Sequence, residues 1–196
     1  MKRATALIAA AALLGTSALA QAGDTKIGIL MDITGPIANF IPPLQNAVNL
    51  AVKQVNAGGG LLDGNAVAVF GDTTGSAQGS VDAAGKLANI ENVPVIMGAL
   101  MSGTTIAAAE AVSIPAGIVQ ISPTATSPAM TAIKDNDLVF RVVPSDNYQG
   151  DVLAKMVLEE GIKKVAVTYV NNDYGVGIGQ TFMEAYKKLE IGRAHV

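Results

Sequence analysis

The sequence predicts an α/β fold in which helices cover both faces of a parallel sheet. Short apolar runs rich in Val and Ile alternate with segments whose apolar residues recur every three or four positions. Buried parallel strands have the first pattern and the amphipathic helices that cover them have the second. Half of the 196 residues are hydrophobic and 15% are charged, so the chain can bury a sizeable core.

The N-terminus comes before the predicted fold. Lys2 and Arg3 precede an apolar run from Ala4 to Leu14, which is shorter than the roughly 20 residues that a membrane span needs. Small-residue cleavage sites follow, with cleavage after Ala20 or Ala22 both possible. Residues 1–22 therefore match a secretory signal peptide, and we expect the mature protein in the periplasm without stable membrane insertion.

Six strands are predicted, each bounded by Gly, Pro, Asn or Asp. They are KIGILM (26–31), AVAVF (66–70), VPVIMG (93–98), GIVQI (117–121), LVFRVV (138–143) and KKVAVTYV (163–170). Between them, one-sided apolar spacing predicts helices over 44–55, 77–88 and 178–189. A further helix begins near Tyr148, where Ser145 or Asp146 can cap it, and ends at Gly161. The three glycines at 58–60 provide a left-handed end for the first helix.

The last six residues, IGRAHV, abandon the helical pattern that precedes them. This hexapeptide is what one reading frame of a common sequencing adapter encodes. We therefore expect 191–196 to be a non-native tail, which makes His195, the single histidine, an artefact as well.

Composition argues against several functions. Cysteine is absent, which removes disulfides, thiolate metal sites and Cys nucleophiles. The net charge of −3 and the lack of a basic run argue against binding to nucleic acid. No combination of acid, base and nucleophile indicates an enzyme, so we expect neither catalysis nor a cofactor or metal.

Two neighbouring strands end in small hydroxyl residues and open backbone. These ends, VIMGALMSGTT (95–105) and IVQISPTATSP (118–128), carry Ser102, Thr104, Thr105, Ser122, Thr124 and Thr126. In an open parallel sheet, ligands bind beyond the carboxyl ends of the strands. Hydroxyls and free N–H groups there can hold a carboxylate without any cation. The alternative is that these residues only cap helices.

Two aromatic residues also follow predicted strands. Phe40 lies after DITGP and Tyr174 lies in NNDYG. Each is placed where it could wall a ligand pocket or simply pack within a loop.

The ordered motifs resemble the Leu/Ile/Val-binding family, the type I periplasmic binding proteins that supply ABC transporters. The resemblance covers Thr25 to about Leu189. It is carried by IGILMDITGP, AVKQVNAGGGLLDG, DTTGSAQGSVDAAGKL, VIMGALMSGTT, IVQISPTATSPAMT, FRVVPSDNYQGDVLA and VAVTYVNNDYGVGIGQTF. It implies a doubly wound, mostly parallel sheet in a first lobe over 23–144. A hinge and an incomplete α/β second lobe follow over 145–190.

The resemblance also implies site residues. Ser102 would bind a ligand α-carboxylate, Thr126 would share it and contact the ammonium, and the Thr124 carbonyl would accept from the ammonium. Tyr174 would close over the ligand and Phe40 would wall its side-chain pocket. Gly103 and Ala125, which adjoin these residues, are included in the predicted site.

The function implied is capture of an amino acid, branched-chain or similar, and its delivery to an ABC transporter permease. The alternative is an extracytoplasmic sensing domain for amides or other small carboxylates. The family's ammonium-binding acid lies beyond the aligned segments. We therefore expect Ser102, Thr124 and Thr126 to face an open side with no acid opposite them.

Overall fold

The computed structural model describes residues 23–62 and 64–193, and the predicted signal peptide lies outside this range. Five strands form one sheet: β1 (Thr25–Met31), β2 (Ala66–Asp72), β3 (Val95–Met97), β4 (Val119–Ser122) and β5 (Val139–Arg141). Every pairing is parallel and the order is β2-β1-β3-β4-β5. The predicted α/β class and parallel sheet are confirmed.

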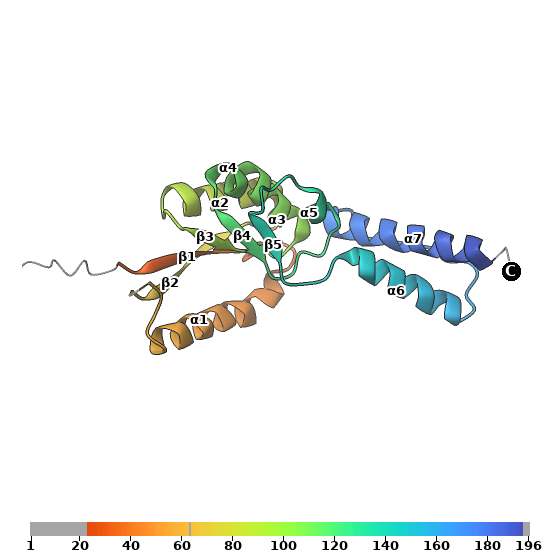
Figure 1. Ribbon diagram of the computed structural model, residues 1–196, viewed down its shortest axis with the longest axis horizontal. Helices are drawn as coiled ribbons and strands as arrows, with labels where there is room; N and C mark the ends of the chain where they lie inside the picture. The colour runs from red at the N-terminus through yellow and green to blue at the C-terminus, as the bar shows by residue number, and fades with distance from the viewer. Residues whose placement is uncertain (1–22, 63, 194–196) are drawn as a thin grey trace, which may run out of the picture.

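Helices cover both faces of this sheet (Figure 1). On one side, α2 (Ala77–Asn89) and α3 (Ser102–Ala108) pack on the apolar face; η2 (Ala109–Ser113) and α4 (Ile114–Ala116) continue α3. On the other side, η1 (Ala38–Phe40) leads into α1 (Ile41–Ala57). The first core contains Leu30, Ala84, Leu87 and Ile96, and the second contains Ile29, Met31, Ile41 and Leu100. Residues 29, 30 and 31 alternate between the two cores, as strand geometry requires.

The predicted helix ends agree with the structure. Ser145 caps α6 (Asp146–Glu159) by accepting from the Asn147 N–H at 3.4 Å. Gly161 follows that helix at φ 73°, and Gly59 follows α1 at φ 112°. Both glycines occupy the left-handed region that residues with a Cβ avoid, which is why glycine ends these helices.

The helical run from Ser102 to Ala116 was not predicted from periodicity. Its residues are mostly Ala, Ser and Thr, so no large apolar stripe marks it. The short α5 (Ala129–Ala132) was also missed. Such segments are helical because tertiary packing supports them more than their own propensity does.

The sheet and the helices that cover it form a first unit; beyond it, α6 and α7 (Asp173–Arg193) form a second unit, a helix pair that extends away from the sheet (Figure 1). Ala154, Leu158, Phe182, Ala185 and Tyr186 form its core. The backbone of α7 continues to Arg193, past Leu189, where the periodicity of the sequence ends. No helix in the described part of the chain is long and apolar enough to cross a membrane.

The sixth predicted strand, 163–170, is wrong as a strand in this structure. Residues 162–170 have no hydrogen-bonded strand neighbour within the described ranges, so they form no ladder. They pack through side chains instead. Val167 adjoins the α6–α7 core, and the Tyr169 ring lies against Gly179. An apolar, β-branched run becomes a strand only when another strand can satisfy its backbone groups.

Candidate ligand-binding site

A cavity of about 560 Å³ lies at the carboxyl ends of the parallel strands. Its lining comes from the loops after β1 to β4 and from the segment that enters α7: Pro36, Ile37, Gly75, Ala77, Leu100, Met101, Ser102, Gly103, Thr104, Thr124, Val170, Asn172, Asp173 and Tyr174. Strand β1 pairs with β2 on one side and with β3 on the other. The order in which successive strands join the sheet therefore changes direction at β1. This is the point at which open α/β sheets bind ligands.

A buried carboxylate, Asp32, joins three strand ends beneath the cavity. It accepts from the Thr73 hydroxyl at 2.6 Å and from the N–H groups of Leu100 and Met101 at 3.1 and 3.2 Å. These bonds fix the β3–α3 loop against β1 and β2. Asp32 was not predicted to have a role in the site, because a polar residue just after a strand is common in loops.

A second carboxylate, Asp72, ties the loop after β1 to the end of β2. Partial burial raises its pKa, but the N–H groups of Thr74 and Thr34 and the Thr34 hydroxyl, at 2.8, 3.1 and 2.8 Å, outweigh burial and lower the pKa overall. The ionised form therefore supports the loop that carries Pro36 and Ile37.

Most hydroxyls of the two strand ends are engaged with the main chain. Thr104 and Thr105 donate to the Met101 carbonyl at 2.9 and 2.8 Å. Ser122 donates to the Ala99 carbonyl at 2.7 Å and accepts from the Ala125 N–H at 3.1 Å. Thr124 donates to the Leu100 carbonyl at 2.6 Å. These four side chains hold the loops of the site together.

Ser102 and Thr126 differ from the other four. The Ser102 oxygen accepts from the Ser127 N–H at 3.3 Å, but its proton has no acceptor among the described residues. The Thr126 hydroxyl oxygen is buried without a hydrogen-bond partner there. These are the two hydroxyls for which the resemblance implies contact with a ligand carboxylate.

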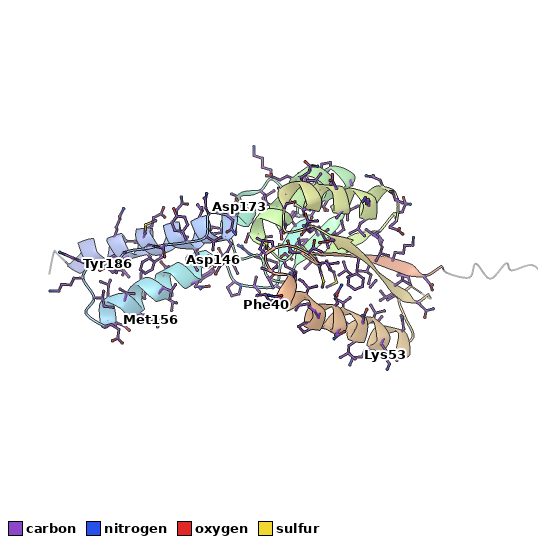
Figure 2. All side chains as sticks on the ribbon, turned by 180° about the vertical axis from the view of Figure 1, so that it is seen from behind. Phe40, Lys53, Asp146, Met156, Asp173 and Tyr186 are labelled. Atoms are coloured by element: carbon purple, nitrogen blue, oxygen red, sulfur yellow. The ribbon has the colours of Figure 1, made fainter. Side chains whose placement is uncertain are left out.

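The predicted site residues divide between the cavity and its surroundings. Ser102, Gly103, Thr124 and Tyr174 line the cavity, and Tyr174 is 44% exposed. Thr126 and Ala125, the neighbours of Thr124 in the sequence, lie outside the lining, and Ala125 is fully buried. Phe40 is 68% exposed at the start of α1, also outside the lining (Figure 2). Pro36 and Ile37, from the same loop, provide the apolar wall there instead.

The expectation that no acid faces Ser102 and Thr124 is wrong. Asp173 lines the same cavity, at the end of α7 nearest the sheet (Figure 2). A Cβ atom at position 103 would lie 2.5 Å from Oδ2 of Asp173, so the carboxylate reaches the backbone of α3. This contact could not be predicted from the sequence, because Asp173 lies in α7 and Gly103 lies in α3, far apart along the chain.

Asp146 forms a polar cluster at the connection between the two units. The carboxylate is 1% exposed, and neither of its oxygens has a hydrogen-bond partner among the described residues. Burial raises its pKa; the nearby Thr126 hydroxyl and Arg141 guanidinium offset only part of this. Arg141 donates to the carbonyls of Thr126 and Ser127 at 3.1 and 2.8 Å, so it is committed to the main chain.

The sequence matches a known family model. Residues 24–192 match the family described as periplasmic binding protein. The Leu/Ile/Val-binding protein homolog 3 of Brucella melitensis is 31% identical over 96% of this chain and 50% of its own length. The leucine-, isoleucine-, valine-, threonine- and alanine-binding protein of Pseudomonas aeruginosa is also 31% identical, over 90% and 47%. The chain thus spans about half the length of the curated relatives it matches.

Solved structures agree. The branched-chain amino acid transporter substrate-binding protein of Streptococcus pneumoniae, in complex with isoleucine, has a TM-score of 0.74 and 30% identity, covering 84% of this chain and 47% of that one. A solute-binding protein of Rhodopseudomonas palustris, in complex with 3,4-dihydroxybenzoic acid, has a TM-score of 0.74 at 21% identity, over 84% and 44%, and shows the fold alone.

The family match covers most of the chain, and the curated relatives confirm the resemblance to Leu/Ile/Val-binding proteins. The chain belongs to the periplasmic binding protein family.

Proposed function

We propose that this protein captures an amino acid, branched-chain or similar, in the periplasm and delivers it to an ABC transporter permease. The observation that carries the proposal is the cavity at the strand ends, where the Ser102 hydroxyl finds no acceptor for its proton among residues 23–62 and 64–193. The names of the Leu/Ile/Val-binding relatives support the same class of ligand.

The ligand carboxylate is assigned to Ser102 and the backbone that follows it. Ser102, Gly103 and Thr104 are the first residues of α3, whose N–H groups lack intrahelical partners. The helical run continues through η2 and α4 to Ala116. These N–H groups and the Ser102 hydroxyl can hold an anion in a place where the lining contains no Lys or Arg.

The rest of the lining suits an aliphatic side chain. Ile37, Leu100, Met101 and Val170 are apolar, and Tyr174 adds an aromatic surface. The cavity volume of about 560 Å³ lies within the range of small-molecule sites. An amino acid held by its carboxylate would therefore place a branched side chain against apolar walls.

The two units of the chain bring parts of one site together. Residues 23–144 contribute the strand ends, and the second unit contributes Val170 to Tyr174. We infer that these are two lobes hinged near Pro144 and Ser145. Closure around the ligand would then generate the surface that a permease recognises.

Calorimetric titration of the full chain, including any sequence that continues it in its gene, against the twenty amino acids tests the proposal. We expect binding to one or more aliphatic amino acids. Binding to a sugar with silence across the aliphatic amino acids would contradict it.

A further inference from the structure

The part of the cavity lining that comes from the sheet unit is divided along the sheet edge. In the strand order, β1 and β2 lie on one side of β3, and β4 lies on the other. The hydroxyl residues Ser102 and Thr124 follow β3 and β4. Four lining residues without a polar side-chain group follow β1 and β2: Pro36, Ile37, Gly75 and Ala77. A ligand whose carboxylate lies at Ser102 can therefore extend its side chain towards the ends of β1 and β2.

Asp72, the last residue of β2, fastens the loop that carries Pro36 and Ile37. Its Oδ1 accepts from the N–H groups of Thr34 and Thr74 at 3.1 and 2.8 Å, and its Oδ2 accepts from the Thr34 hydroxyl at 2.8 Å. Two of these three bonds cross from the end of β2 to the loop after β1. Asp72 does not line the cavity itself, so it acts on a ligand through this loop.

The loops after β1 and β2 also touch at two glycines. A Cβ atom at Gly35 would lie 2.5 Å from the Thr74 carbonyl oxygen, and one at Gly75 would lie 2.5 Å from Cδ of Pro36. The main chains of the two loops therefore lie against each other with no side chain between them. The place of Pro36 in the cavity wall thus depends on how the end of β2 is held.

We propose that Asp72 is a positioning residue that sets the selectivity of the site for the ligand side chain. This inference rests on the proposed function. The hydrogen bonds of Asp72 hold the apolar wall formed by Pro36 and Ile37, which a large aliphatic side chain needs more than a small one does. The loop that carries Ser102 is fastened separately, because Asp32 accepts from the two N–H groups before Met101 ends. Loss of Asp72 should therefore affect the side chain of a ligand and spare its carboxylate.

The test is calorimetric titration of L-leucine and L-alanine into the full chain and its Asp72→Ala variant. We expect leucine affinity to fall about 10-fold, as when roughly two methylene groups lose their apolar contact. Alanine affinity should change by less than about 3-fold, since a single methyl group makes little use of the wall. Asp82→Ala, at an exposed acid of α2, removes the same charge away from the cavity and should alter neither affinity.

Asp72→Asn is the conservative variant that separates loop position from charge. Its Oδ1 can still accept from the Thr34 and Thr74 N–H groups, and its Nδ2 can donate to the Thr34 hydroxyl oxygen. The ratio of leucine to alanine affinity should therefore return close to that of the wild type. A role confined to stability would lower the melting temperature of Asp72→Ala and leave this ratio unchanged.

A double-mutant cycle between Asp72→Ala and Ile37→Ala reads the same coupling from leucine alone. If Asp72 acts through the wall, the double variant should lose little more leucine affinity than the weaker-binding single variant. Additive losses, or an unchanged ratio of leucine to alanine affinity in Asp72→Ala, would overturn the role of Asp72 and leave amino-acid capture standing. Wild-type protein that does not bind leucine would also overturn this role, and wild-type protein that binds no amino acid would refute the proposed function as well.

Discussion

At the scale of single residues, the strand-end hydroxyls are chemically alike but have different roles. Ser122 and Ser102 are both buried serines at strand ends, with 0% and 2% exposure. Ser122 donates to the Ala99 carbonyl, just after β3, and accepts from the Ala125 N–H, whereas the Ser102 oxygen has one long contact of 3.3 Å and its proton has no acceptor among the described residues. Substituting each serine therefore separates ligand binding from stability.

We predict that Ser102→Ala weakens amino-acid binding by about 1.5–3 kcal/mol, the range for a hydrogen bond to a charged group, with little change in melting temperature. Ser122→Ala, the matched control, should instead destabilise the fold by about 1–3 kcal/mol, because it leaves the Ala99 carbonyl and the Ala125 N–H unpaired. Calorimetry and thermal unfolding of the full chain measure both effects. A Ser102→Ala variant with a lower melting temperature and an unchanged affinity for amino acids would show that Ser102 caps the helix and does not bind the ligand.

Sequence reasoning located this edge of the sheet but could not sort its residues. The position of Ser102 after a buried strand is visible in the sequence, and Ser102 does line the cavity. That Thr104 is committed to the Met101 carbonyl is not visible, because the same residue type can serve a loop or a ligand. Asp173 was missed because its neighbour, Gly103, lies 70 positions earlier in the chain.

At the scale of secondary-structure elements, the unpaired carboxylate of Asp146 costs stability in the first turn of α6. The N-terminus of a helix favours negative charge, but burial without hydrogen-bond partners opposes it and raises the pKa above the ordinary value of 3.8. The folded state therefore binds this proton more tightly than the unfolded chain does. The stability is therefore full below the ordinary pKa of 3.8, falls as the pH rises from there to the raised pKa, and stays at its lower value above it.

We predict that Asp146→Asn makes the protein more stable than the wild type at neutral pH, because the amide is neutral, whereas the wild-type carboxylate has to ionise in a buried place. The difference should shrink as the pH falls from about 7 towards about 4, because the wild-type carboxyl becomes neutral. Urea unfolding of both proteins across this range measures it. Asp151→Asn, in the same helix but exposed, controls for net charge. A difference that does not vary with pH, or a less stable Asp146→Asn, would contradict the argument.

Two elements show why sequence patterns alone were insufficient at this scale. The segment 163–170 has the composition of a strand, yet it has no partner within the described residues. The run 102–116 lacks an amphipathic stripe, yet it is helical because Ala108 and Ala109 are fully buried within the first unit. In both cases, contacts between distant segments override the local pattern.

At the scale of the whole molecule, many large apolar side chains remain exposed in this chain. Val142 is 73% exposed, Val170 65% and Phe140 47%. They lie on the edge strand β5, on the connection that follows it and on the unpaired segment before α7. Exposed apolar surface beside an open sheet edge favours association with other chains.

We predict that the 196-residue chain, expressed alone, aggregates or binds amino acids very weakly. Its cavity is already lined by both units, but the core of α6 and α7 is separate from the two cores that cover the sheet. Lobes joined in this way move relative to each other, and motion of Tyr174 and Asp173 away from Ser102 would open the site. Light scattering, thermal unfolding and calorimetry with leucine measure the three consequences. A chain extended to the length of its relatives is the matched control and should be monodisperse. If the 196-residue chain is itself monodisperse, melts sharply and binds leucine with micromolar affinity, then the described residues already form a complete and stable site.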